Sequence, residues 1–125
     1  MKSCVVLIFC ILFLYSIGHG QQGLQNRMYA KDLLKTNLHD TLRVVTLNDL
    51  GFTYIFERSD SGIQYILQAK SLADRIHFEK GSITSSSNLA IAYMLKGETY
   101  RAIHYAYEAL TLAQKIKNNQ LILGA

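Results

Sequence analysis

The chain has 125 residues, which is the size of one domain and leaves no room for a second, catalytic one. Half of the residues are hydrophobic and 18% are charged, so the composition is that of a folded protein and not of a disordered one. The formal net charge of +4 is small, and the basic residues are dispersed along the chain, which argues against a nucleic-acid-binding surface. The absence of proline favours a helical fold.

The N-terminal segment, residues 1–20, has the pattern of a secretory signal peptide. Lys2 precedes residues 4–17, an almost wholly apolar run, and a polar stretch follows. A permanent helical span needs about 20 apolar residues, so this run is short for one. The small residues at its end place the predicted cleavage between Gly20 and Gln21. An uncleaved N-terminal anchor is the alternative.

Cleavage at this position would leave a mature chain without cysteine. Cys4 and Cys10 are the only cysteines, and both lie in the segment that is removed. Disulfides, thiolate metal sites and a cysteine nucleophile are therefore not expected in the mature protein.

Residues 21–40 are a lead-in to the rest of the chain. Leu24, Met28, Leu34 and Leu38 are spaced as on one helix, which would pack on the segment that follows. A solvated lead-in without such packing is the alternative.

The remainder of the chain contains an internal repeat. Residues 50–54 recur 39 positions later as residues 89–93, and residues 65–76 recur 40 positions later as residues 105–116. Each unit has the apolar periodicity of two helices, and the short connection between them requires an antiparallel pair.

The two predicted units span residues 41–80 and 81–119. In the first unit, one helix carries apolar residues from Leu42 to Ile55, with Asp40 or Thr41 as its N-cap. A turn is expected at residues 57–62 and the second helix of this unit at residues 63–76. In the second unit, the first helix is expected at residues 83–96, the turn at residues 97–99 and the second helix at residues 100–117.

Residues at matching positions of the two units are expected to hold the helices together. Small side chains there let neighbouring backbones approach closely, and the larger ones fill the space between helices. These repeat-packing residues are Leu50, Gly51, Tyr54, Gly62 and Ala69 in the first unit and Leu89, Ala90, Tyr93, Ala102 and Ala109 in the second.

This pattern resembles the tetratricopeptide repeat (TPR), over residues 41–125. The matching feature is Leu-(Gly/Ala)-x-x-Tyr, followed by a small residue and an Ala seven positions later; the frequent Trp and Pro of the family are missing. The resemblance implies an all-α fold in which antiparallel helix hairpins stack as an α-solenoid. The period near 40 is similar to that of repeats in the N-terminal extracytoplasmic region of bacterial sensor histidine kinases and related regulators.

The last residues are predicted to begin a third unit. Residues 120–125 align with residues 80–85, where the second unit begins, so the pattern indicates a truncated third repeat and a fragment of a longer protein. A repeat unit buries its hydrophobic face only against neighbours, so an array of two units would leave one apolar face exposed.

We expect no catalytic, cofactor or metal site in these residues, and hence no enzyme activity. His77 lacks a second histidine four positions away, as zinc-binding helices require, and His39 and His104 have ordinary helix-start and helix-surface positions. Gly81 and Ser82 lack the clustered glycines of a phosphate-binding loop. A kinase in a longer protein would lie beyond Ala125.

The TPR resemblance also implies a groove, because the first helices of successive units line the concave side of such arrays. The residues expected there are Asn48, Phe52, Ile55, Phe56, Ser87, Ile91, Met94 and Leu95. Most are apolar, which favours an apolar helix of a protein or peptide partner over a charged C-terminal tail. For Ile55 and Leu95, ordinary core packing is the alternative.

The function implied is a protein-interaction or sensing module, exported across the inner membrane. It would be periplasmic or attached to the membrane facing the periplasm, as the N-terminal part of a signal-transduction protein such as a sensor histidine kinase. A free-standing secreted or periplasmic TPR scaffold without a kinase is the alternative. Its partner is expected to be a protein, a peptide or neighbouring repeats of the same chain, with no nucleic acid, and membrane contact only through the signal segment or a downstream span.

Overall fold

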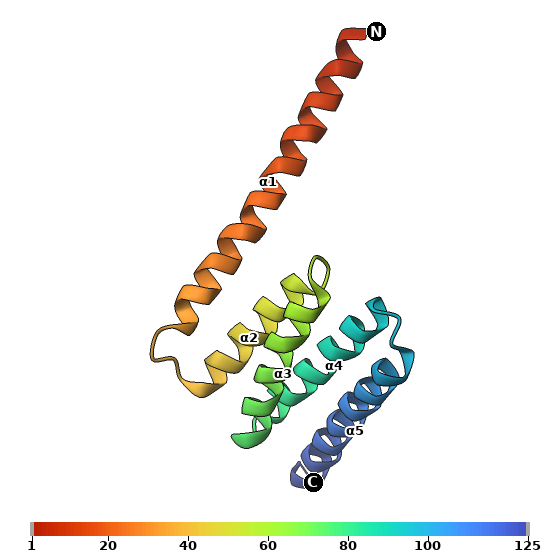
Figure 1. The fold of residues 1–125 in the computed structure, drawn as a ribbon. Coiled ribbons are helices and arrows are strands. Elements are labelled where there is room, and N and C mark those ends of the chain that lie inside the picture. Colours follow the sequence, from red (N-terminus) through yellow and green to blue (C-terminus); the bar gives the residue numbers. More distant parts are fainter. Residues whose placement is uncertain (1, 125) are drawn as a thin grey trace.

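The computed structural model describes residues 2–124, except for the side chains of residues 3, 15–21, 121 and 123. Within this range the chain forms five α-helices and no strand, so the predicted all-α fold is confirmed (Figure 1). The helices are α1 (Lys2–Leu34), α2 (Asp40–Tyr54), α3 (Ser59–Arg75), α4 (Glu79–Leu95) and α5 (Thr99–Leu123).

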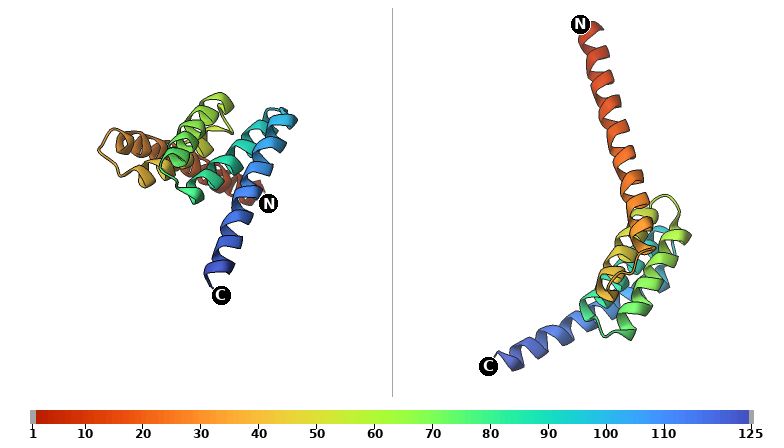
Figure 2. Two further views of the ribbon diagram at one scale, coloured as in Figure 1. Left: turned by 90° about the horizontal axis from the view of Figure 1, so that it is seen from below. Right: turned by 90° about the vertical axis from the view of Figure 1, so that its left-hand side faces the viewer.

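The last four helices form two antiparallel hairpins, α2 with α3 and α4 with α5. α4 packs against both helices of the first hairpin, and α1 lies on α2. As a result α2 and α4 run side by side in the same direction (Figure 1). The N-terminal part of α1 and the C-terminal end of α5 project from the packed region (Figure 2).

Two helices begin four residues earlier than the apolar periodicity predicts. α3 begins at Ser59 and α4 at Glu79, because small and polar residues that break the apolar pattern form their first turns. In α4 these residues are Gly81 and Ser82, which are buried although they carry no large apolar side chain. The predicted N-caps Asp40 and Thr41 were wrong, since both lie inside α2 and His39 has the cap position without a side-chain cap hydrogen bond.

α5 is longer than predicted, since it ends at Leu123 and not at residue 117. Residues 120–123 continue the helix, where the repeat pattern requires a turn before residue 120. The preceding residues 115–119 are all compatible with a helix and include neither glycine nor proline, so nothing in them stops it.

α1 packs on α2 through a stripe that matches the predicted one only in part. Leu34 packs on the core as predicted, and Leu38, which follows α1, is partly buried. Leu24 and Met28 are 57% and 59% exposed, so they do not make this contact. The other partly buried positions of α1 are Gly23, Arg27, Ala30 and Leu33. Their spacing is helical, but Arg27 breaks the apolar pattern by which such a stripe is recognised.

The two helices of the first hairpin touch through their backbones. A Cβ atom on Gly62 would lie 2.7 Å from the carbonyl oxygen of Gly51 and 2.8 Å from the backbone nitrogen of Ile55. A Cβ atom on Gly51 would lie 2.8 Å from the carbonyl oxygen of Gly62. Contacts this short with backbone atoms are relieved only by moving one helix relative to the other.

We predict that Gly62→Ala lowers the free energy of unfolding by about 1–3 kcal/mol, because overpacking outweighs the better helix propensity of alanine. Urea denaturation followed by circular dichroism measures this. The matched control is Gly23→Ala, where an added Cβ has no neighbour within 4 Å, and whose stability should stay the same or rise slightly. Equal stability of the two variants would contradict the close backbone contact.

Two of the turns depend on a residue with positive φ. His77 after α3 has φ 56° and Gly97 after α4 has φ 77°. The backbone N–H groups of Phe78 and Glu98 donate to the carbonyl oxygens of Ala73 and Tyr93, at 2.8 and 2.9 Å, as in a Schellman C-cap. His77 therefore has a backbone role in a conformation that suits glycine better.

We predict that His77→Gly raises the free energy of unfolding by about 0.5–1 kcal/mol, since removing the left-handed strain outweighs the greater entropy of unfolded glycine. Gly97→Ala should do the opposite and destabilise by about 1 kcal/mol, because it introduces the same strain. Thermal unfolding of both variants checks the pair. A destabilised His77→Gly variant would show that the imidazole itself stabilises the turn.

Candidate interaction surface

The predicted groove residues do not form a single surface. Asn48 and Ile55 are 2% and 1% exposed. Ile55 belongs to the core, so its assignment to a groove was wrong, whereas Asn48 is buried but lines a hollow between α2 and α4. Ile55 packs in a cluster with Ile63, Ile66 and Leu89, and the side-chain amide of Asn48 donates to Ser85 Oγ at 2.9 Å. The reason is that α4 covers the side of α2 on which both residues lie.

Ser87 and Ile91 of the predicted groove line a different hollow, which lies between α4 and α5. Met94 is exposed, and it occupies the repeat position of the buried Ile55. Phe52, Phe56 and Leu95 are the predicted groove residues that remain on the open side of α2 and α4 as exposed apolar side chains.

We define the inner surface as the exposed side of α2 and α4 between α1 and α5. It includes Val45, Asp49 and Phe52 of α2 and Phe56 of the turn after α2, which follow one another at a spacing of three or four. The rings of Phe52 and Phe56 meet edge to face at a centroid distance of 5.5 Å.

A small hollow separates α2 from α4 on the inner surface. Its volume is about 140 Å³, and Val45 and Asp49 of α2 line it opposite Lys80 and Thr84 of α4. Val45, Asp49 and Thr84 were not among the residues predicted for the groove. A helical wheel could have identified the two α2 residues. Val44, Leu47 and Gly51 mark the side of α2 that faces the core, and Val45 and Asp49 lie on the exposed side next to it.

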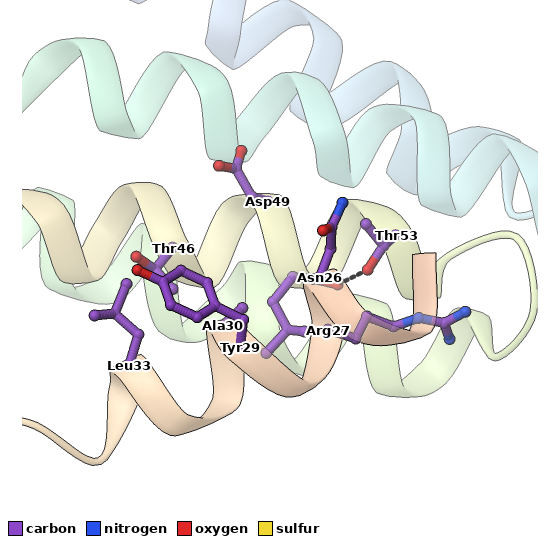
Figure 3. Close-up of a pocket in the computed structure, with 9 residues that line it drawn as sticks. Asn26, Arg27, Tyr29, Ala30, Leu33, Thr46, Asp49 and Thr53 are labelled. Atoms are coloured by element: carbon purple, nitrogen blue, oxygen red, sulfur yellow. Dashed lines mark hydrogen bonds between the residues drawn. The ribbon is translucent and has the colours of Figure 1, made fainter. Parts of the chain in front are cut away.

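A second, larger hollow of about 290 Å³ lies between α1 and α2 (Figure 3). Asn26, Arg27 and Leu33 of α1 line it opposite Thr46 and Thr53 of α2, and it shares Asp49 with the first hollow. Partial burial raises the pKa of the Asp49 carboxyl group. None of the ion pairs within the described residues involves Asp49.

Arg27 joins α1 to the end of the first hairpin. Its guanidinium group makes a bidentate ion pair with Glu57, with N–O distances of 2.6 and 2.7 Å. The same group lies over the ring of Tyr54, 4.9 Å from its centroid. Lys31, with Arg27, lowers the pKa of the Tyr54 hydroxyl group. This cluster fixes the wall of the larger hollow.

Each hairpin contains a pair of stacked tyrosines at matching repeat positions. Tyr54 stacks on Tyr65 at a centroid distance of 5.7 Å, and Tyr93 stacks on Tyr105 at 5.6 Å. Arg101 lies over Tyr93, as Arg27 lies over Tyr54. The sequence repeat thus coincides with a repeated contact between the two helices of each hairpin.

The residues predicted to pack the repeats lie between helices. Leu50, Gly51, Gly62, Ala69, Leu89, Tyr93, Ala102 and Ala109 are buried, and Tyr54 and Ala90 are partly buried. In the second hairpin, alanines replace the two glycines that touch in the first.

Lys70, the residue that interrupts the apolar pattern of α3, is the centre of an ion-pair network. Its Nζ lies 2.9 Å from Asp74 and 2.7 Å from Glu108 of α5. Ser82 and Ser86 of α4 donate to the same two carboxylates. Burial alone would lower the pKa of Lys70, but its hydrogen bonds to Glu108 and Asp74 raise it above its usual value. The network ties α3, α4 and α5 together and has no open cavity.

The described residues contain no group of three potential metal-ligating side chains. His77 is exposed in its turn, His104 contacts the edge of Tyr105, and His39 lies 2.9 Å from Thr41 Oγ1. Gly20 and Gln21, at the predicted cleavage position, lie within α1, and their side chains are outside the described part. Among the described helices, none combines the length and hydrophobicity of a membrane span.

Comparisons with protein-family models, curated proteins and solved structures find no match to this chain.

Proposed function

We propose that the chain is a protein-interaction module whose inner surface binds an apolar helical segment of a partner. The observation that supports this best is the exposure of Phe52, Phe56 and Leu95, which are 37%, 64% and 51% accessible on neighbouring helices. Large apolar side chains grouped on one face are typical of binding surfaces. A helix laid in a shallow apolar depression is a common mode of recognition.

Asp49 favours a partner that has no acidic side chain opposite its carboxylate. Its carboxylate lines both hollows and is partly desolvated, so a partner carboxylate placed there would meet like charge. A lysine or arginine of the partner would instead pair with Asp49. Capture of a negatively charged C-terminal tail is therefore disfavoured, as the sequence also indicates.

The wider proposal is a TPR-like α-solenoid segment exported across the inner membrane. The repeated tyrosine stacks and the small residues between hairpin helices support the repeat. Such a segment would sense or bind a partner in the periplasm as the N-terminal part of a signal-transduction protein such as a sensor histidine kinase. The alternative is a free-standing secreted or periplasmic scaffold with no kinase. We propose no enzyme activity, cofactor or nucleic-acid ligand for these residues.

Panning a random 16-residue peptide library on the immobilised chain tests the inner surface. We expect amphipathic, apolar peptides that bind the wild type and bind the double variant Phe52→Asp, Leu95→Asp at least tenfold more weakly. Both replaced side chains are exposed, so the helical circular-dichroism signal should be unchanged.

The matched control is the double variant Tyr100→Asp, Tyr107→Asp, which replaces two exposed aromatic residues of α5 outside the inner surface. It should keep wild-type affinity for the selected peptides. Peptides that bind both double variants equally, or loss of helicity in Phe52→Asp, Leu95→Asp, would contradict the proposed surface.

Export is tested by expressing the whole chain in a bacterial host and measuring the intact mass of the periplasmic product. We predict a protein that begins at Gln21, because the apolar run is short for a span. Leu12→Arg, which puts a charge into that run, should keep the chain in the cytoplasm at its full mass. Membrane-bound wild-type protein that keeps residues 1–20 would instead establish the uncleaved anchor.

A further inference from the structure

The second hairpin has an apolar face, here called the end face, on the side of α4 and α5 away from the first hairpin. It surrounds a hollow of about 440 Å³, lined by Ile83, Ser87 and Ala90 of α4 and by Ala106, Leu110 and Ala113 of α5. Ser87, Ala106, Leu110 and Ala113 are exposed, so solvent reaches this hollow. The end face is separate from the inner surface proposed above.

The internal repeat gives every position of the end face a counterpart in the first hairpin. Ile83, Ser87 and Ala90 correspond to Val44, Asn48 and Gly51, 39 positions earlier. Ala106 and Ala113 correspond to Ile66 and Ala73, 40 positions earlier. These five counterparts are all buried in the structure, whereas Phe52, the counterpart of Ile91, which also lines the hollow, is 37% exposed.

The first hairpin also shows what covers such a face. α4 packs on α2 and α3 through residues that are mostly small, namely Gly81, Ser82, Ser85, Ser86 and Leu89. A Cβ atom on Gly81 would lie 2.8 Å from Val44 Cγ1, so the covering helix approaches closely only because this position has no side chain. Ser85 adds polar contacts, since it accepts from Asn48 and donates to the carbonyl oxygen of Gly81.

At the position of Lys70 the end face carries Leu110. Lys70 is held by two carboxylates, whereas Leu110 is exposed and has no charge to satisfy. The end face is therefore more apolar than its counterpart, and burying Leu110 would stabilise a complex through the hydrophobic effect.

We propose that the end face binds an amphipathic partner helix that resembles α4, with Gly or Ser in its first two turns and a leucine one turn further on. The interface would continue the one that α4 forms with the first hairpin. The small residues let the partner helix lie close to Ala90, Ala106 and Ala113 and cover Leu110. Its leucine packs beside Met94 and Ala106, the counterparts of Ile55 and Ile66, which share a cluster with Leu89 of α4.

A synthetic, fluorescein-labelled peptide of residues 78–95, the segment that covers the first hairpin, is the probe. Fluorescence anisotropy with the whole chain should show saturable binding. Leu110→Glu should weaken binding at least tenfold, because it puts a carboxylate into the contact. Tyr107→Glu is the matched control, since Tyr107 is equally an exposed apolar residue of α5 and does not line the hollow. It should bind like the wild type.

Replacing Gly81 and Ser85 of the peptide by leucine should also abolish binding, because larger side chains hold the helix away. Three results would overturn the proposal. The first is absence of binding at millimolar concentration, and the second is equal binding by Leu110→Glu, which would mean that the peptide replaces α4 in the first hairpin. The third is a dimer in light scattering that Leu110→Glu dissociates, which would make a second copy the occupant.

Discussion

Gly51 and Gly62 let the backbones of α2 and α3 touch, and the positions of the other helices depend on that contact. Because neither residue carries a Cβ, Ile55 and Ile66 lie directly beside the crossing and fill the space next to it. Both isoleucines belong to the buried cluster that also contains Leu89 of α4. A wider hairpin would open this cluster and move α4 away from the first hairpin. The close crossing therefore determines where α4 lies, and with it both surfaces proposed to bind partners.

The same use of small residues recurs between the hairpins, combined with polar groups. α4 contacts the first hairpin through Gly81, Ser82 and the buried Ser85 and Ser86, so the two hairpins lie close together with few large side chains between them. Hydroxyl groups at this interface are satisfied by Asn48, Asp74 and Glu108. Buried polar groups cost free energy unless they are hydrogen-bonded, so this interface specifies one arrangement more strictly than an apolar one would.

The sequence predicted the helical hairpins because repeats and apolar periodicity report directly on which residues face a core. It failed where small or charged residues take core positions. Gly81 and Ser82 were assigned to the connection before α4 although they are buried, and the helix face of α1 was misplaced because Arg27 packs through its stem and its cation. The groove was misassigned at Ile55 for another reason. Periodicity locates a side chain on its own helix, but it does not tell which neighbouring helix covers it.

Two pairs of residues at matching repeat positions show the effect of the neighbouring helix. Ile55 is paired with Met94, and Asn48 is paired with Ser87. The members of each pair hold the same repeat position, yet one is buried and the other exposed. The difference lies in the neighbour, because α4 covers the first hairpin and the equivalent face of the second is open to solvent. Burial at these positions is thus a property of the next helix and not of the residue. It follows that Ser87 and Met94 act as core residues or as binding residues according to whether a helix occupies the end face.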